Sequence, residues 1–408
     1  MSYQSTPALP AVTGYDQGAV TEYLNRLHAK NRNAGFSLCQ YAHGAPNMKG
    51  GAYYGGCYSP TQNRIYLAPF GIPSQGSVNM AMWHYIDCTT GKVVEYASGV
   101  SIVQFAYIGG VYSPLQDRIY LVPMGQGPET YWHYIDCRTG TVVPYTHTGS
   151  YVVTNGYAGG CYSPTQNRIY FAPYSQMAQT YWHYIDCGST DGSTGGVTPY
   201  SHPGSFSVSD NYVGSVYSPA SDRIYFIPTS YYDMTYWHYI DCATGSVVPY
   251  THTPMYVSYP YECGVYSPLQ DRIYLTPYAQ SNQAQWHYID CATAAVVAYD
   301  TGISVGFGAY TGGAYSPTTN RIYLAPYEQS SQPVWHYIDC NTGSVVPYTH
   351  GTACVIDGYL GAVYSPTQGR AYMIPYLQGA ESSLHYVQDY ALPEASITLM
   401  SSAAFNKF

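Results

Sequence analysis

Seven of the 13 histidines recur in one sequence context and are the first candidates for chemistry. In each copy of the same stretch the histidine follows Trp or Leu and precedes Tyr. The seven are His84, His133, His183, His238, His287, His336 and His385. Imidazole is a common metal ligand. However, residues in seven separate copies of a repeat cannot converge within the roughly 2 Å that a shared ion requires. We therefore expect packing and hydrogen bonding from these histidines, with no metal site and no cofactor.

Arginine and aspartate recur with the same spacing. Seven of the 14 Lys and Arg residues open the stretch Arg-Ile-Tyr or Arg-Ala-Tyr, and Asp ends most copies of the next stretch, Trp-His-Tyr-Ile-Asp. Antiparallel pairing would place the two side by side. The sequence predicts six structural ion pairs: Arg64 with Asp87, Arg118 with Asp136, Arg168 with Asp186, Arg223 with Asp241, Arg272 with Asp290, and Arg321 with Asp339. The last copy has Gln388 instead of Asp and Gly369 before Arg370, so we expect it to be the least regular.

Six of the 11 cysteines directly follow these aspartates. In separate copies they lie too far apart for a disulfide, which needs Cα atoms within about 7 Å of each other. We therefore expect free, buried thiols, consistent with synthesis in a reducing compartment.

All these residues belong to a repeat of 49 to 50 residues. Its clearest marker is Tyr-Ser-Pro, with separations of 54, 50, 55, 49, 49 and 49 residues between the tyrosines Tyr58, Tyr112, Tyr162, Tyr217, Tyr266, Tyr315 and Tyr364. Two five-residue insertions, one before Trp83 and one between Cys187 and Tyr200, account for the two longest intervals. Such a period is typical of repeat architectures.

Each copy has the pattern of four short strands. Pro-x-x-Asn/Asp is a turn after the first strand, and Asp-Cys-x-Thr-Gly is a turn after the third, in which the carboxylate can accept backbone N–H bonds. Tyr, Ile and Val suit the pleated surfaces between the turns. The copies contain no 3.6-residue pattern. The sequence therefore predicts an all-β fold, a seven-bladed β-propeller of four-stranded antiparallel blades.

The motif Ser-Pro-x-x-Asn/Asp-Arg-Ile-Tyr, followed by Ile-Asp-x-x-Thr-Gly-x-Val-Val, resembles the YVTN-type repeat of seven-bladed propellers in surface-layer and related proteins. The resemblance extends from about Tyr53 to Asp389 and depends on the repetition. Trp-His-Tyr departs from the pattern, because the family has small aliphatic residues and Ser there. The resemblance implies the propeller fold. It implies no catalytic residues, so no function is carried over.

The two chain ends predict how the ring closes. Tyr41 lies 17 residues before Tyr58, as Tyr145 lies 17 before Tyr162, whereas the last copy lacks Thr-Gly-x-Val-Val. We expect residues 36–43 to supply the outer strand of blade seven, so that no sheet edge is left free. The predicted organisation is an N-terminal arm (1–35) with an amphipathic helix, a propeller (36–390) and a C-terminal tail (391–408). The helix would pack on the propeller rim or dock on a partner.

Composition narrows the partners and the location. Charged residues make up 9% of the chain, against about 25% in an average domain. The net charge of −9 argues against nucleic acid, and no apolar run is long enough to span a membrane. Met1 to Gly14 lacks the features of a signal peptide. We expect a protein made in a reducing cytoplasm and displayed on a virion or an extracellular surface without a signal peptide.

The two faces of the predicted ring differ. The turns between the first and second strands and between the third and fourth strands are almost invariant, whereas the other loops vary, and loops often carry recognition. Each copy also has a Tyr five residues before that of Tyr-Ser-Pro, an odd offset that would reverse its side-chain direction. It would either wedge between blades or contribute to a collar at the channel mouth that binds a sugar or a partner. The seven residues are Tyr53, Tyr107, Tyr157, Tyr212, Tyr261, Tyr310 and Tyr359.

These observations favour a non-enzymatic structural or interaction propeller on a particle or cell surface, such as a capsid, decoration, tail or fibre protein of a virion. Its partners would be other proteins or further copies of itself. The first alternative is a lectin-like adhesin that binds glycans. The second is a propeller enzyme with an axial active site, for which Lys49 and Glu262 are candidates. The sequence has no hydrolase, zinc-protease or phosphate-loop motif.

Overall fold

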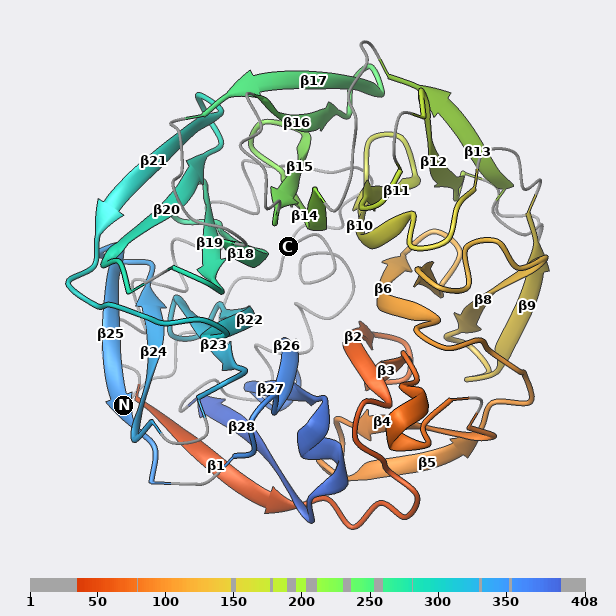
Figure 1. Ribbon diagram of the computed structural model, residues 1–408, viewed down its shortest axis with the longest axis horizontal. Helices are drawn as coiled ribbons and strands as arrows, with labels where there is room; N and C mark the ends of the chain where they lie inside the picture. Colours follow the sequence, from red (N-terminus) through yellow and green to blue (C-terminus); the bar gives the residue numbers. More distant parts are fainter. Residues whose placement is uncertain are drawn as a thin grey trace, which may run out of the picture.

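Seven four-stranded antiparallel sheets surround a central axis in the computed structural model (Figure 1). The fold is the predicted all-β, seven-bladed propeller. The structure describes residues 35–78, 80–147, 152–176, 179–188, 196–202, 211–229, 236–252, 260–280, 282–329, 332–351 and 354–389. The predicted N-terminal helix and the C-terminal tail lie outside the described residues. No helix in the described part of the chain is long and apolar enough to cross a membrane.

Six blades are each built from four consecutive strands, and blade seven combines β26, β27 and β28 with β1; within a blade the first strand lies nearest the axis. The first strands are β2 (Tyr53–Ser59), β6 (Tyr107–Ser113), β10 (Tyr157–Ser163), β14 (Tyr212–Ser218), β18 (Tyr261–Ser267), β22 (Tyr310–Ser316) and β26 (Tyr359–Ser365). The second strands are β3 (Arg64–Pro69), β7 (Arg118–Pro123), β11 (Arg168–Pro173), β15 (Arg223–Pro228), β19 (Arg272–Pro277), β23 (Arg321–Pro326) and β27 (Arg370–Pro375).

The third and fourth strands of each blade lie toward the outside of the ring. The third strands are β4 (Met82–Asp87), β8 (Tyr131–Asp136), β12 (Tyr181–Asp186), β16 (Tyr236–Asp241), β20 (Gln285–Asp290), β24 (Val334–Asp339) and β28 (Ser383–Asp389). The fourth strands are β5 (Val93–Ala97), β9 (Val142–Thr146), β13 (Gly196–Ser201), β17 (Ser246–Thr251), β21 (Ala295–Asp300), β25 (Ser344–Thr349) and β1 (Phe36–Ala42). Two 3-10 helices, η1 (Pro73–Gln75) and η2 (Leu377–Ala380), lie in loops between second and third strands.

The turns between first and second strands and between third and fourth strands share one end of the ring, which we call the turn face. In blade one, Asn63 has φ of 53°, a left-handed conformation that Asn and Asp tolerate. Its carbonyl accepts a hydrogen bond from the Cys88 N–H at 2.9 Å, and its side chain accepts one from the Tyr58 hydroxyl at 2.9 Å. Five other blades repeat both bonds, which explains why Tyr-Ser-Pro-x-x-Asn/Asp recurs. The opposite end of the ring is the loop face.

The hydrophobic core lies between neighbouring blades. The six tryptophans are buried, and each belongs to a cluster that joins two or more blades. Trp132 of blade two, for example, meets Phe171 of blade three edge to face at 5.9 Å between ring centroids. Aromatic pairs of this kind contribute roughly 0.5–1.5 kcal/mol beyond the area that they bury. Packing between blades therefore holds the ring together.

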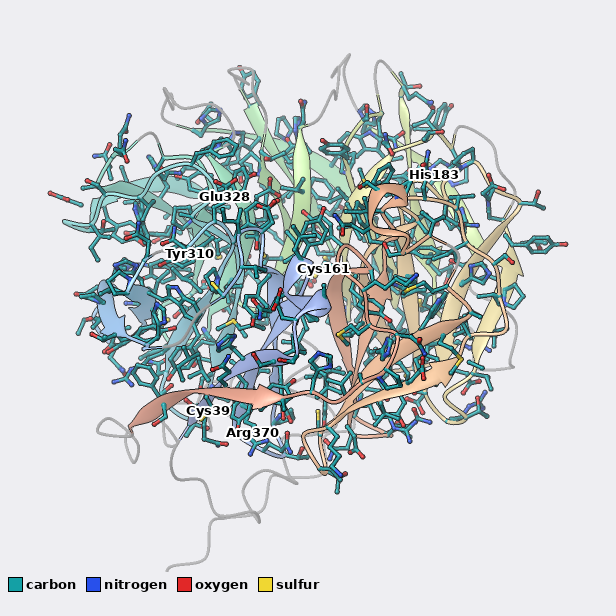
Figure 2. The ribbon with its side chains drawn as sticks, turned by 60° about the horizontal axis from the view of Figure 1, so that its bottom comes forward. Cys39, Cys161, His183, Tyr310, Glu328 and Arg370 are labelled. Atoms are coloured by element: carbon teal, nitrogen blue, oxygen red, sulfur yellow. The ribbon has the colours of Figure 1, made fainter. Side chains whose placement is uncertain are left out.

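The ring closes through the N-terminal strand, as the spacing of Tyr41 predicts. Strand β1 pairs antiparallel with β28 over seven residue pairs and becomes the outer strand of blade seven. Figure 2 shows β1, marked by Cys39, along the outside of the blade that carries Arg370. Phe36 also contacts blade six, where its ring lies 5.2 Å from the rings of Tyr323, Tyr337 and Tyr348. The closing strand thus joins two blades.

Blade seven departs from the repeat at the predicted positions. Gln388 takes the place of the aspartate, and its Oε1 accepts a 2.6 Å hydrogen bond from Arg370. Asp389 stands where the six other blades have Cys, and its carboxylate accepts hydrogen bonds from Ser316 and Tyr323 of blade six. Burial raises the pKa of Asp389 to about 6, although these hydrogen bonds oppose the shift. Polar contacts therefore replace a thiol at the closing interface.

Candidate functional site at the loop-face end of the channel

The seven candidate collar tyrosines are buried in the packed ring of blades and do not line the channel mouth. Their exposed fractions are 0 or 1%, and each hydroxyl is hydrogen-bonded to Nδ1 of the third-strand histidine of the same blade. The pairs are Tyr53–His84, Tyr107–His133, Tyr157–His183, Tyr212–His238, Tyr261–His287, Tyr310–His336 and Tyr359–His385. The collar interpretation is wrong, and the structure supports the alternative of a wedge between blades: Tyr107 of blade two, for example, packs in one cluster with Tyr66 and Trp83 of blade one.

A β-bulge explains the error. In every blade the pairing of the first and second strands shifts register just after this tyrosine, for example between Tyr53 and Gly56. An extra residue breaks the two-residue alternation on which the predicted direction depended. Gly55 occupies the bulge of blade one with φ of 76°, and a Cβ there would lie 3.2 Å from the Gly109 Cα of blade two. Glycine thus permits both the bulge and the close approach of first strands.

The histidines position these tyrosines and are not available as ligands. In blade one, His84 Nε2 lies 3.0 Å from the Pro46 carbonyl, which can only accept, so Nε2 carries the proton and Nδ1 accepts from Tyr53. Burial lowers the pKa of His133, His238, His287, His336 and His385 to about 4. No group of three His, Cys, Asp or Glu in the described ranges has metal-binding geometry.

The predicted ion pairs are correct in register, but four of the six are not formed among the described residues. Arginine faces aspartate across the second and third strands in blades one to six. Nevertheless, in the part of the chain described, Arg64, Arg168, Arg223 and Arg272 form no ion pair with Asp87, Asp186, Asp241 and Asp290. Each guanidinium lies over a third-strand tyrosine at 4.2 to 4.6 Å from the ring centroid: Arg64 on Tyr85, Arg118 on Tyr134, Arg168 on Tyr184, Arg223 on Tyr239, Arg272 on Tyr288, Arg321 on Tyr337 and Arg370 on Tyr386.

The aspartates instead stabilise the turn that follows them. The Asp87 carboxylate accepts the Thr89 N–H at 2.8 Å, and Asp241 accepts both the N–H and the hydroxyl of Thr244. The corresponding bonds are present for Asp136, Asp186, Asp290 and Asp339. Asp136 also forms an ion pair with Arg138 at 2.9 Å, a residue two positions further on. The carboxylates are therefore engaged locally, while the arginine charge lies on an aromatic face.

The cysteines are free, and burial raises the pKa of the six that follow the third-strand aspartates. None of the 11 cysteines forms a disulfide. Burial raises the pKa of Cys88, Cys187 and Cys340 to about 12. Because the thiolate is the nucleophilic form, such thiols are structural.

Two cavities follow the axis of the ring. One, of about 290 Å³, is lined by the fourth to sixth residues of all seven first strands and lies toward the turn face. The other, of about 190 Å³, is lined mostly by second to fourth residues of the first strands, including Glu262, and lies toward the loop face. Among the described residues that line either cavity, Glu262 of β18 is the one charged side chain. The second cavity therefore combines a mostly apolar wall with a single carboxylate.

Tyr54 of blade one reaches Glu262 of blade five across the channel. Its hydroxyl donates a long hydrogen bond of 3.5 Å to Glu262 Oε2. Burial raises the pKa of Glu262 to about 7, and the bond from Tyr54 opposes that shift. The other axial candidate, Lys49, donates to the Gly76 carbonyl at 2.6 Å and does not line the cavity. The two residues proposed for an axial active site are thus not brought together.

An aromatic arc borders this end of the channel. It consists of Phe70, Tyr376, Tyr327 and Tyr278, each of which directly follows the proline that ends a second strand, in blades one, seven, six and five. Successive ring centroids lie 6.5, 6.3 and 5.9 Å apart, and Phe70 lies 5.3 Å from Tyr54. The pKa of Tyr54 is raised by burial, then by Glu262 and by the neighbouring Tyr327, Tyr278 and Tyr376.

Sequence reasoning did not identify the arc, although a signal was present. The residue after the second-strand proline is aromatic in five of the seven copies, at Phe70, Tyr174, Tyr278, Tyr327 and Tyr376. The position lies at the start of the loop between the second and third strands, and the other residues of that loop vary from copy to copy. The mouth of the channel thus has aromatic residues, but they come from the ends of second strands.

Exposed aromatic residues lie further out on the loop face. Tyr131, Tyr181 and Tyr236 open the third strands of three successive blades and are 52, 36 and 45% exposed. Tyr131 also borders a groove of about 340 Å³ together with Gln126 and Glu129. Phe307, in contact with Tyr278 of the arc, is 61% exposed.

Comparisons with known proteins identify the fold. No family model matches the chain, and no curated protein matches it. Among solved structures, the RRP9 WD40 repeats align with a TM-score of 0.55 at 8% identity, covering 88% of this chain and 100% of that one. The Cps50 (Swd1) β-propeller domain of Myceliophteria thermophila aligns with a TM-score of 0.52 at 10% identity, covering 84% and 98%.

An extracellular domain from B. thetaiotaomicron has the same TM-score of 0.52 at 10% identity, over 89% of this chain but 44% of that chain. At these identities the likeness establishes the fold alone. The protein is therefore a seven-bladed β-propeller, and its function has to be argued from its own residues.

Proposed function

We propose that this protein is a non-enzymatic interaction propeller that contacts its partner, another protein or further copies of itself, through the loop face. The observation that carries this proposal is the contrast between the two faces. On the turn face, the same side chains form the same hydrogen bonds in blade after blade. On the loop face, the sequence varies between copies, and it includes the aromatic arc and the exposed tyrosines.

The fate of the potentially catalytic residues supports a non-enzymatic role. Third-strand histidines are bonded to buried tyrosines, and the aspartates of blades one to six are bonded to their turns. Burial raises the pKa of Cys88 and of the five cysteines equivalent to it. Glu262 remains as an isolated carboxylate at the axis. One carboxylate without a second acid or base nearby favours binding over acid–base catalysis.

We further propose display on a particle or cell surface, as in a capsid, decoration, tail or fibre protein of a virion. Low charge and 52 tyrosines support this setting. Immunogold electron microscopy of intact particles and cells of the source organism tests it. Gold on the outer surface is the expected result, and gold confined to the cell interior would overturn the assignment.

A lectin-like role is the second candidate, and the exposed Tyr131, Tyr181 and Tyr236 at one repeat position favour it, since tyrosine presents an apolar face and a polar tip to a sugar. A glycan array separates the two. Specific binding that is lost on substitution of the three tyrosines by serine would favour a lectin. A protein that binds no glycan on the array but assembles stably would favour the structural role.

A further inference from the structure

The carboxylate of Glu262 lies in the channel, and none of the described residues provides it with a basic partner. It faces Tyr54, which is hydrogen-bonded to it, and the adjacent Cys263. The repeat arginines begin second strands at the turn face, and Lys49 is bonded to Gly76. A carboxylate removed from bulk water normally has a cation or several hydrogen-bond donors beside it. Here a single long bond serves that role in the described part of the chain.

The surroundings of Glu262 suit an organic cation. Tyr54 and the three tyrosines of the arc bring phenol groups close together at this end of the channel. Aromatic rings attract ammonium and guanidinium groups through their negative faces, by about 0.5–2 kcal/mol per contact depending on burial. A metal ion would need several oxygen ligands, and no such cluster exists in the described residues.

The volume of the cavity and the charges around its mouth indicate which kind of cation would bind. The cavity of about 190 Å³ is smaller than the roughly 300–1,000 Å³ typical of drug-sized ligands, so it suits one side chain. Two more carboxylates border the same sector of the mouth. Burial raises the pKa of Tyr327 and of Glu328, and the Asp357 carboxylate raises both further; Glu328 would contact any Cβ placed at Gly308. Together with a net charge of −9, they favour a basic guest.

We propose that the loop-face end of the channel binds the cationic end of a lysine or arginine side chain from the partner, with Glu262 as its counter-charge and the aromatic arc around it. This inference rests on the proposed recognition role of the loop face. The guest would displace the Tyr54 hydroxyl from Glu262 and replace one long hydrogen bond by a charge-assisted one.

Titration calorimetry with three small probes tests the site. The probes are N-acetyl-lysine methylamide, N-acetyl-arginine methylamide and the neutral N-acetyl-norleucine methylamide. At least one cationic probe should bind tenfold or more tightly than norleucine, and the tighter of the two identifies the side chain. Glu262→Gln should remove this preference, whereas Glu129→Gln, a matched loss of charge on the same face but beside the groove of blade two and outside the channel, should change affinity less than threefold.

The pH dependence provides a second readout in the unaltered protein. Because Glu262 with a pKa of about 7 must be ionised, cation affinity should fall roughly tenfold between pH 8 and pH 6, in proportion to the ionised fraction. This readout also serves if the Gln variant does not fold. Cationic and neutral probes binding alike, or equal affinity at the two pH values, would overturn the proposal. Loss of probe binding with an intact loop-face contact to the partner would reject this site alone.

Discussion

At the scale of single residues, buried polar groups in this propeller are paired mainly through tyrosine. Tyrosine hydroxyls bond to histidines inside the blades, and tyrosine rings lie under the guanidinium groups at the turn face. In blade two, the ladder between second and third strands ends at Tyr120 and Tyr134, and the Tyr107–His133 bond links first and third strands beyond that point. A neutral pair of this kind avoids the desolvation cost of a buried ion pair.

Removal of one hydroxyl measures this pairing. Tyr107→Phe keeps the ring but leaves Nδ1 of buried His133 without its donor, which should cost roughly 1–3 kcal/mol of unfolding free energy. Urea unfolding of the variant provides the value, and Tyr131→Phe, at an exposed position, is the matched control with an expected change below about 0.5 kcal/mol. Equal effects at the two positions would contradict the proposed role of the bond.

The same histidines should make the fold sensitive to acid. Burial lowers the folded pKa values of His133, His238, His287, His336 and His385 to about 4, below the ordinary histidine value of about 6.5, so the unfolded chain binds more protons between these limits. Stability should therefore be lost as the pH falls from 6.5 toward 4, by up to about 1.4 kcal/mol per pH unit for each histidine.

Other groups modify this slope. Nearby His202, His252 and His350 lower the pKa of His238, His287 and His385 further. The raised pKa values of Asp389 and Glu262 act in the opposite direction, since their stabilising effect is lost as the pH rises through about 6 and 7. Five histidines outweigh two carboxyl groups, so the urea midpoint should fall between pH 6.5 and pH 4.5. A constant or rising midpoint over that interval would be inconsistent with neutral buried histidines.

Thiol chemistry is predicted at the same scale. Titration of the unfolded protein without reductant should count close to 11 thiols, and the folded protein should react slowly because burial raises the pKa of Cys88 and the cysteines equivalent to it. Four or more missing thiols would mean that disulfides exist.

Side-chain direction was the least predictable property at this scale. The Asp-Cys-x-Thr-Gly motif correctly predicted that Asp87 would accept backbone N–H bonds. The same aspartate was also expected to pair with Arg64, and strand register alone could not decide between the two partners. The side-chain direction of Tyr53 was predicted wrongly because of the β-bulge that follows it. Every copy contains this bulge, so it does not change the spacing of the repeat.

At the scale of elements, the repeat determines nearly everything that the sequence predicts. Tyr41 and Tyr58 are separated by the same number of residues as Tyr145 and Tyr162. Because each outer strand lies a fixed number of residues before the next inner strand, this spacing was sufficient to place β1 in blade seven. The contact of Phe36 with blade six was not predictable, since it depends on the relative placement of two blades.

Deletion of residues 1–43 tests this closure. It should expose the edge of β28 and remove Phe36 from its three tyrosine contacts, so that the protein aggregates or its melting temperature falls by roughly 10 °C or more. Deletion of residues 1–34, which retains β1, is the matched control. If both truncated proteins melt alike, β1 does not close the ring.

At the scale of the whole molecule, the ring separates a constant face from a varied one. Fold requirements act on every copy, so they make the turns alike, and the copies differ where these requirements are relaxed or where contact is selected. The sequence marked Glu262 as an axial candidate, but its proximity to Tyr54 and to the arc could not be predicted, because residues from four blades meet only when the ring is closed.

The central claim is that the loop face carries the recognition. Hydroxyl-radical footprinting of the isolated protein and of its native assembly compares side chains of similar exposure on the two faces. Tyr131, Tyr236 and Phe307 lie on the loop face at 52, 45 and 61% exposure, and Leu115 and Leu269 lie on the turn face at 41 and 38%. We predict protection of the first group in the assembly with little change in the leucines. Protection of Leu115 and Leu269 with unchanged reactivity of the aromatic residues would contradict the account.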